Sequence, residues 1–308
     1  MKESVAKSVF EELHGLLHSG KWSEGLALSD TILGPTSRRL PHWCGEECDY
    51  LLLHLSGGLG DVVMFSRFFP VLQERGIRVV CNYADSNFEG KRQLLELIRR
   101  QDWCDPDLLT HGHFEEIAPG PGRFWMDLSD MAHIFQLSPQ TVWEWPSPLW
   151  KIEPSTDIVS RDGKLLIGLC TESSKKPDLG RSLSSSQVAR LVASIPQVRW
   201  VNLNPWVTLD FPNLCNPPRD TVTKVGALIA SCDLVVSIDT FSAHLSAALG
   251  KDTRMLLLNP ELTSWIWAND PPWYRSLKYF RDREDVGLDD AVEQVIASLK
   301  SLTRDSAS

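Results

Sequence analysis

The sequence predicts an α/β protein built from two parallel sheets, and three observations support this prediction. Short apolar runs alternate with helical stretches through most of the 308 residues. Several of these runs end in loops rich in glycine or in charge, which is typical of strands that lead into helices. The alternation stops at the Trp- and Pro-rich run 142–150 and starts again after Gly163. Because alternating strands and helices favour a parallel sheet, two such blocks indicate two similar layered domains.

Residues 1–40 predict a helical hairpin. Apolar residues recur at helical spacing on both sides of a break at Gly20, in a pattern that resembles one tetratricopeptide unit. A single unit of this kind cannot bury its own apolar face, so we expect the hairpin to pack on the rest of the chain. Pro35 and Pro41 bound the linker that follows.

The first α/β block covers residues 48–155, and the second covers 160–285. In the first block we expect strands at 50–55, 77–83 and 124–127, and helices at 62–75 and around 94–98. In the second we expect strands at 165–170, 198–203, 234–238 and 255–258, and helices at 184–195, 222–230 and before Gly250. Residues 286–308 supply a closing helix at 288–302. The run 142–150 is too irregular for a core element.

Composition limits the partners. The formal charge of −9 and the pI of about 5.4 argue against nucleic acid, since nucleic-acid binders carry basic stripes. The first residues lack a long apolar run, which argues against a signal peptide or a membrane span. Seven scattered cysteines without a CxxC pair indicate reduced thiols and a cytoplasmic location. Cys44 and Cys48 could alternatively form a metal or redox pair.

A glycine loop, Ser56-Gly-Gly-Leu-Gly-Asp61, lies between a predicted strand and a predicted helix. Gly57, Gly58 and Gly60 would let a ligand approach the backbone, and the helix N-terminus favours negative charge. A dinucleotide-binding fingerprint competes with this interpretation, but it needs a glycine where Val63 stands.

Asp61 is a candidate general base. A carboxylate at a helix N-terminus is ionised at neutral pH, and it can accept a proton from a hydroxyl that becomes acidic during attack. The alternative is that Asp61 only caps the helix.

The loop 171–183 gathers the cations Lys175, Lys176 and Arg181 after a predicted strand. Cations at the carboxyl end of a strand can neutralise a diphosphate leaving group. The loop could equally be a solvated surface turn.

The run 232–250 reads as a buried strand that leads directly into a helix, with Asp239 and Thr240 at the junction and His244 one turn later. Ligands of open α/β sheets bind beyond the carboxyl ends of strands, where the next helix offers N–H groups to anions. These three residues therefore indicate a negatively charged small molecule, with a phosphorylated one as the first candidate. His244 could instead be a half-buried hydrogen-bonding residue.

Three motifs in order resemble glycosyltransferase family 9, in particular its heptosyltransferase-like members, which often follow tetratricopeptide repeats. They are Gly58-Leu-Gly-Asp61 with Phe65-Ser-Arg-Phe-Phe-Pro70, Asp233-Leu-Val-Val-Ser-Ile-Asp-Thr240 with Ala243-His-Leu245, and Asp270-Pro-Pro-Trp-Tyr-Arg-Ser-Leu277 before Tyr279-Phe-Arg281. The likeness covers roughly residues 48 to 285.

The resemblance implies a GT-B fold of two Rossmann-like domains facing a cleft, with the acceptor on 48–155 and a nucleotide-sugar on 160–285. It implies inverting transfer to a glycan, lipid-linked or protein acceptor, with Asp61 as base, Asp239, Thr240 and His244 at the donor, and no metal or cofactor. Phe241 stands where the family commonly has a small residue. Two alternatives remain: a non-catalytic binding protein that has lost donor affinity, and a dinucleotide-dependent sugar-nucleotide enzyme.

Overall fold

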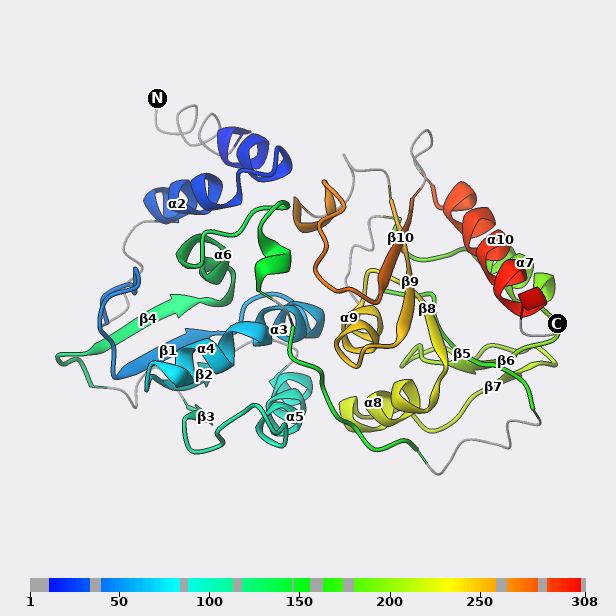
Figure 1. Ribbon diagram of the computed structural model, residues 1–308, viewed down its shortest axis with the longest axis horizontal. Coiled ribbons are helices and arrows are strands. Elements are labelled where there is room, and N and C mark those ends of the chain that lie inside the picture. The colour runs from blue at the N-terminus through cyan, green and yellow to red at the C-terminus, as the bar shows by residue number, and fades with distance from the viewer. Residues whose placement is uncertain are drawn as a thin grey trace. The chain divides into compact units, whose positions relative to one another are not determined.

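The computed structural model describes residues 11–33, 40–83, 88–112, 118–145, 147–155, 163–173, 180–258, 265–281 and 287–305. The chain divides into two compact units (Figure 1). Unit 1 comprises Met1–Pro148 and Ser264–Trp273, and unit 2 comprises Leu149–Thr263 and Tyr274–Ser308. A short segment near the C-terminus therefore returns to unit 1.

Unit 1 contains a four-stranded parallel sheet in the order β3-β2-β1-β4. Its strands are β1 (Tyr50–His54), β2 (Arg78–Asn82), β3 (Leu109–His111) and β4 (Arg123–Asp127). The central strand β1 has a fully buried run at residues 51–53, because both faces of a parallel sheet are covered. The predicted strands in this block are confirmed, and β3 was missed because it is only three residues long.

The helices of unit 1 are short. They are α2 (Trp22–Leu33), α3 (Leu59–Phe65), α4 (Phe69–Glu74), α5 (Phe88–Arg99) and α6 (Met131–Ile134), with 3-10 turns η1 (Ser66–Phe68), η3 (Leu128–Asp130) and η4 (Val142–Glu144). The expectation of one continuous helix over 62–75 was wrong, because η1 separates α3 from α4. Pro70 is the physical reason, since its ring excludes the helical hydrogen bond to the carbonyl of Ser66.

The N-terminal hairpin packs within unit 1. Residues 11–18 are helical and α2 follows them. Trp22 is fully buried and stacks on Trp273, with ring centroids 5.6 Å apart. The Ser23 hydroxyl lies 3.0 Å from Nδ1 of His133 on α6. The apolar face of the hairpin is thus covered by residues of unit 1, as its pattern requires.

Two side chains of the run 142–150 belong to the buried core. Val142 and Trp150 are buried, one in each unit. The backbone N–H of Trp150 donates to the carbonyl of Ala248 at 3.0 Å. The expectation that this run lies outside the core was therefore wrong for these two side chains.

Unit 2 contains a six-stranded parallel sheet in the order β10-β9-β8-β5-β6-β7. Its strands are β5 (Leu166–Cys170), β6 (Arg199–Asn202), β7 (Leu214–Cys215), β8 (Leu234–Ile238), β9 (Asp252–Leu257) and β10 (Leu277–Arg281). The predicted strand at 234–238 has the observed bounds. The edge strands β7 and β10 were missed because β7 has two residues and β10 is only partly buried.

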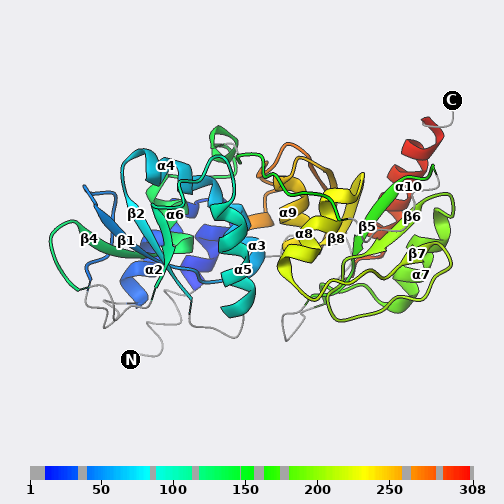
Figure 2. The same ribbon diagram turned by 90° about the horizontal axis from the view of Figure 1, so that it is seen from below.

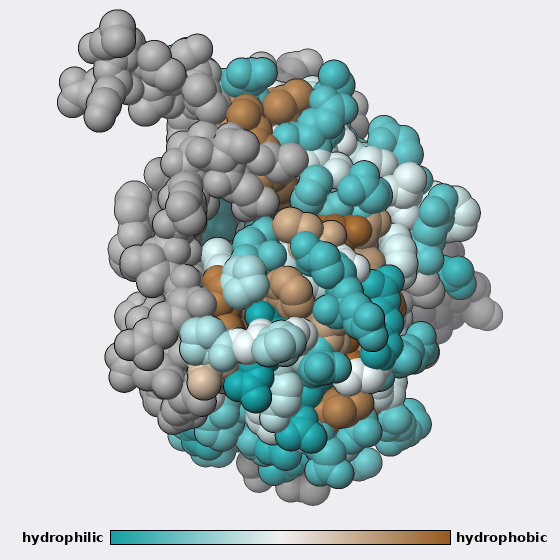
Figure 3. Space-filling view, turned by 90° about the vertical axis from the view of Figure 1, so that its left-hand side faces the viewer, coloured by the Kyte–Doolittle hydropathy of each residue, from teal (hydrophilic) through white to brown (hydrophobic). Residues whose placement is uncertain are grey.

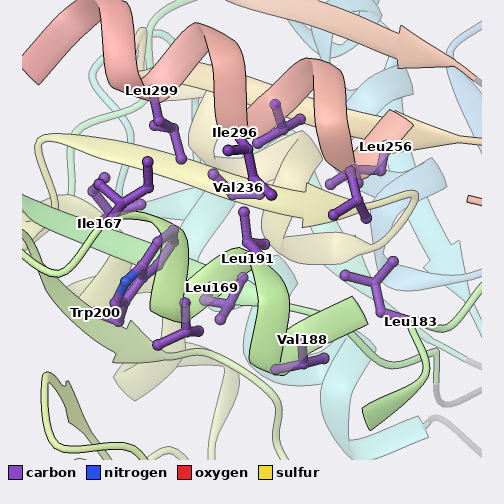
Figure 4. Close-up of a cluster of buried hydrophobic side chains, with 14 of the residues drawn as sticks. Ile167, Leu169, Leu183, Val188, Leu191, Trp200, Val236, Leu256, Ile296 and Leu299 are labelled. Atoms are coloured by element: carbon purple, nitrogen blue, oxygen red, sulfur yellow. The ribbon is translucent and has the colours of Figure 1, made fainter. Parts of the chain in front are cut away.

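Helices cover both faces of this sheet. They are α7 (Ser185–Ser194), α8 (Val222–Ser231), α9 (Phe241–Ala248) and α10 (Asp289–Asp305). Both views place α8 and α9 on one face, and α7 and α10 on the other (Figure 1, Figure 2). Under α7 and α10, aliphatic side chains and Trp200 form one buried cluster (Figure 4). This layering gives unit 2 a continuous core.

The surface of unit 1 carries both apolar and polar residues (Figure 3). Figure 3 shows the side that carries α2, β4 and β1 in Figure 1, where small apolar areas alternate with polar ones. Such mixing is ordinary for a folded chain in water. Among the described residues, no helix is long and apolar enough to cross a bilayer.

One buried cation, Arg67, binds the last residue of the second segment of unit 1, Trp273. Arg67 in η1 is 4% exposed, and its guanidinium donates to the carbonyls of Met64 at 2.9 Å, Trp145 at 2.8 Å and Trp273 at 2.6 Å. The same group lies over the Trp273 ring, 4.9 Å from its centroid. Arg67 therefore links its own segment to Trp273, which is 206 residues later in the sequence.

We expect Arg67→Ala to lower the free energy of unfolding by about 3 kcal/mol or more, because three carbonyls, two of them in buried hydrogen bonds, would lose the Arg67 donor. Urea unfolding measures the change. Arg100→Ala is the control, since Arg100 is an exposed arginine of unit 1 and its replacement should change stability by less than about 0.5 kcal/mol. Equal stability of the two variants would show that Arg67 does not hold the segment.

Candidate functional site

Each sheet has one point at which the order of strands reverses, because later strands are added on the other side of the first strand. In unit 1 the strands run β1, β2, β3 to one side and β4 to the other, so the reversal lies between β1 and β4. In unit 2 it lies between β5 and β8. Loops that leave adjacent strands at such a point go to opposite faces and leave a crevice where ligands bind. The predicted site residues that the structure describes lie in these loops or in the helices α3 and α9 that follow them.

At the reversal in unit 1, two carboxylates organise the carboxyl ends of β1 and β4. The Ser56 hydroxyl donates to Oδ1 of Asp127. Ser129 also donates to that oxygen, from its hydroxyl at 2.8 Å and from its N–H at 3.1 Å. Asp130 Oδ2 accepts the N–H of Asp127 at 2.6 Å and lies 2.9 Å from His42 Nε2. Asp127 ties the glycine loop to β4, a contact that the sequence did not indicate.

The glycine loop closes tightly over Asp61. Gly57 has φ of +76°, and a Cβ on it would lie 2.5 Å from Oδ2 of Asp61. That oxygen accepts the N–H of Gly58 at 2.6 Å. The capping alternative for Asp61 is therefore a feature of the structure, and it leaves a half-buried carboxylate at the start of α3.

A buried lysine supports this loop from α5. Lys91 is fully buried, and its ammonium donates to the carbonyl of Leu55, next to Ser56. A buried charge is costly unless it is paired or hydrogen-bonded. Lys91 therefore fixes the backbone from which the loop begins. The sequence did not predict this contact, because Lys91 appears there only as one lysine within an amphipathic helix.

In unit 2 the reversal point is occupied by an ion pair. Arg181, from the loop after β5, has Nη1 3.5 Å from Oδ2 of Asp239, which follows β8. Its Nη2 donates to the hydroxyl of Ser173 at 2.6 Å. Two residues from distant predicted motifs thus meet where the topology opens a crevice.

His244 completes this arrangement from α9. It is 4% exposed, and its Nε2 lies 3.5 Å from Oδ1 of Asp239. Its Nδ1 lies 3.4 Å from the hydroxyl of Tyr274. Asp239 therefore sits between a guanidinium and an imidazole, which orients its carboxylate. The hydrogen-bonding alternative for His244 is observed, and it links the residue directly to the candidate site.

Thr240 is the N-cap residue of α9, but its side chain does not cap the helix. Its hydroxyl lies 2.9 Å from the Ser237 hydroxyl and 3.5 Å from Cys170 Sγ. The Ala243 N–H donates to the Thr240 carbonyl at 3.0 Å, so the N–H groups that this helix end can offer to an anion are those of Phe241 and Ser242. Burial raises the pKa of the Cys170 thiol, so this neighbour is neutral at physiological pH.

The predicted residues fall into two groups. Arg181, Asp239, Thr240 and His244 are brought together in unit 2, and Gly57, Gly58, Gly60 and Asp61 form the loop of unit 1. Lys175 and Lys176 lie outside the described residues. Among the described residues, no group of three or more potential metal ligands is assembled.

Known structures share this architecture. A heptosyltransferase II of E. coli, described as an ADP-heptose lps enzyme, superposes with a TM-score of 0.55 at 15% identity, covering 84% of this chain and 100% of that one. A glycosyl transferase family 9 protein of Veillonella parvula DSM 2008 gives 0.54 at 12%, covering 85% and 100%. The chain has the GT-B fold. The resemblance seen in the motifs is confirmed at the level of fold.

A third similar structure also shares the fold. TibC of enterotoxigenic E. coli, described as an iron-containing dodecameric glycosyltransferase, gives a TM-score of 0.50 at 9% identity, covering 80% of this chain and 66% of that one. No family model and no curated protein matches the sequence. The metal-free chemistry and the tetratricopeptide likeness of the hairpin remain predictions.

The tight closure of the glycine loop is testable with one substitution. We expect Gly57→Ala to lower the free energy of unfolding by about 1–3 kcal/mol through its positive φ, and further through the contact with Asp61. Gly76→Ala is the matched control, since Gly76 has φ of +75° and no atom within 4 Å of its Cβ position. Chemical denaturation compares them, and an equal loss in both variants would disprove the contact.

Proposed function

We propose that the protein is an inverting glycosyltransferase that moves a sugar from a nucleoside diphosphate to an acceptor hydroxyl. The observation that carries the proposal is the placement of charged groups at both reversal points of a GT-B fold. Unit 2 offers a guanidinium and a helix N-terminus, which suit a diphosphate. Unit 1 offers a carboxylate that can take a proton.

The leaving group is assigned to unit 2. As the bond between the anomeric carbon and the diphosphate breaks, negative charge develops on the phosphate oxygens. Arg181 and the first-turn N–H groups of α9 are donors fixed before the reaction, so they stabilise this charge without reorganisation. Asp239 and the Ser173 hydroxyl hold the guanidinium in place.

The role of general base is assigned to Asp61. The acceptor oxygen forms a bond to the anomeric carbon from the face opposite the diphosphate, and its proton passes to the carboxylate. The bond from the Gly58 N–H keeps the carboxylate in position. Capping and catalysis are therefore compatible roles for one side chain.

The donor is proposed as a nucleotide-sugar, in line with the ADP-heptose named for the E. coli structure. Phe241 begins α9, beside the proposed diphosphate position, and it is partly exposed. A bulky ring there motivates a second candidate, a binding protein without donor turnover.

A donor panel separates these candidates. Purified protein is titrated calorimetrically with nucleotide-sugars and nucleoside diphosphates, and then incubated with mixed donors and a lysate while products are followed by mass spectrometry. Sugar transfer with release of a nucleoside diphosphate supports the enzyme. Binding without transfer from any donor supports the second candidate.

Asp61→Asn separates capping from catalysis. The amide oxygen can still accept the Gly58 N–H, so we expect stability and donor affinity close to wild type. The base is lost, and we expect the transfer rate to fall by about 100-fold or more. If the variant turns over at the wild-type rate, Asp61 serves only as a cap. Asp61→Ala removes both roles and should be less stable by about 1 kcal/mol.

Arg181→Gln tests the leaving-group site. Loss of a charged hydrogen-bonding group should weaken nucleoside diphosphate binding about tenfold to a hundredfold, and reduce its dependence on salt. Arg190→Gln is the control, since Arg190 lies on α7 and pairs with Asp289 and Glu293. Isothermal titration measures both variants, and equal affinities would remove Arg181 from the site.

A further inference from the structure

Trp206 presents an unusual surface in unit 2. It is 78% exposed, more than either of the other two exposed large hydrophobic side chains of the described residues, Trp143 and Leu149. It lies in the loop after β6, at the carboxyl end of the strand. Ligands of open α/β sheets bind beyond the carboxyl ends of the strands, and an exposed indole ring at this end can stack on a flat ligand group.

The loop that carries Trp206 is held firmly. Asn202 is fully buried, and its Nδ2 donates to the carbonyl of Val207 at 2.6 Å and to Oδ1 of Asn216 at 2.7 Å. Arg219 donates to the same Val207 carbonyl from Nη2 at 2.6 Å. The residue directly after Trp206 is thus fixed by two side chains, so the ring is displayed by an organised loop.

The same network reaches the proposed diphosphate site. Asn204 Oδ1 accepts the N–H groups of Thr171 at 2.7 Å and Glu172 at 2.9 Å. The next residue of that loop, Ser173, accepts from Arg181. The loop of Trp206 and the loop of Arg181 are therefore one hydrogen-bonded assembly.

The spacing suits the two ends of a nucleotide. The strands β8, β5 and β6 are neighbours, and adjacent strands lie about 4.8 Å apart, so β6 lies about 10 Å from β8. A nucleoside diphosphate carries its phosphates at one end and a flat aromatic base at the other. With the phosphates at the β5–β8 reversal, the loop after β6 is therefore within reach of the base.

We propose that Trp206 is the platform on which the nucleobase of the donor stacks. This inference rests on the proposed function and extends it to the position of the base. Stacking on an indole accepts any base, so Trp206 contributes affinity for nucleotides, while choice among bases comes from other groups. The sugar is held at the phosphate end, so it does not compete for this ring.

The test compares ligands with and without a base. ADP, UDP and inorganic pyrophosphate are titrated calorimetrically into wild type, Trp206→Ala and Trp206→Phe. We expect Trp206→Ala to bind ADP and UDP about ten- to a hundredfold more weakly, and pyrophosphate with unchanged affinity. Trp206→Phe retains a flat ring and should stay within a few-fold of wild type.

Trp143→Ala is the matched control, an exposed tryptophan of unit 1 at 59%, and it should leave all three affinities unchanged. Thermal unfolding checks that Trp206→Ala is folded, as expected for an exposed side chain. Equal ADP affinity in wild type and Trp206→Ala, or an equal loss for pyrophosphate, would overturn the platform while leaving the proposed function in place. Wild-type protein that binds no nucleoside diphosphate would overturn both.

Discussion

The order of strands within each parallel sheet is the constraint on which the rest depends. Where the chain reverses, between β1 and β4 in unit 1 and between β5 and β8 in unit 2, the outgoing loops separate. Polar side chains meet at these two points. Ser56 with Asp127 and Arg181 with Asp239 are the two results. The two sheets have a similar topology, but the polar contact in unit 1 joins a hydroxyl to a carboxylate, whereas that in unit 2 joins a guanidinium to a carboxylate.

Both sites use carboxylates that are already engaged. Asp61 accepts a backbone N–H of its own loop, and Asp239 lies between Arg181 and His244. Such contacts fix direction, and fixed groups stabilise developing charge better than mobile ones. These contacts hold both carboxylates in the orientations that the proposed reaction uses. The buried Lys91 acts in the same sense on the backbone of the glycine loop.

Much of the fold could be predicted from local pattern. The buried strand 234–238 and the helix after it could be predicted, because an apolar run is followed by polar residues and then by an alanine-rich stretch. The helix after the glycine loop was predicted as continuous, although Pro70 carried the signal for a break. Edge strands β7 and β10 were not predicted, because their partners, rather than their own periodicity, make them strands.

The sequence alone determined the class of fold, the glycine loop and the types of charged residue available, since these depend on neighbours along the chain. Tertiary structure decided which of these residues meet. Arg181 pairs with Asp239, 58 residues later in the sequence, and Arg67 donates to the carbonyl of Trp273, 206 residues later. Contacts between positions so far apart leave no local trace, because loop closure and packing set them only when the sheets form.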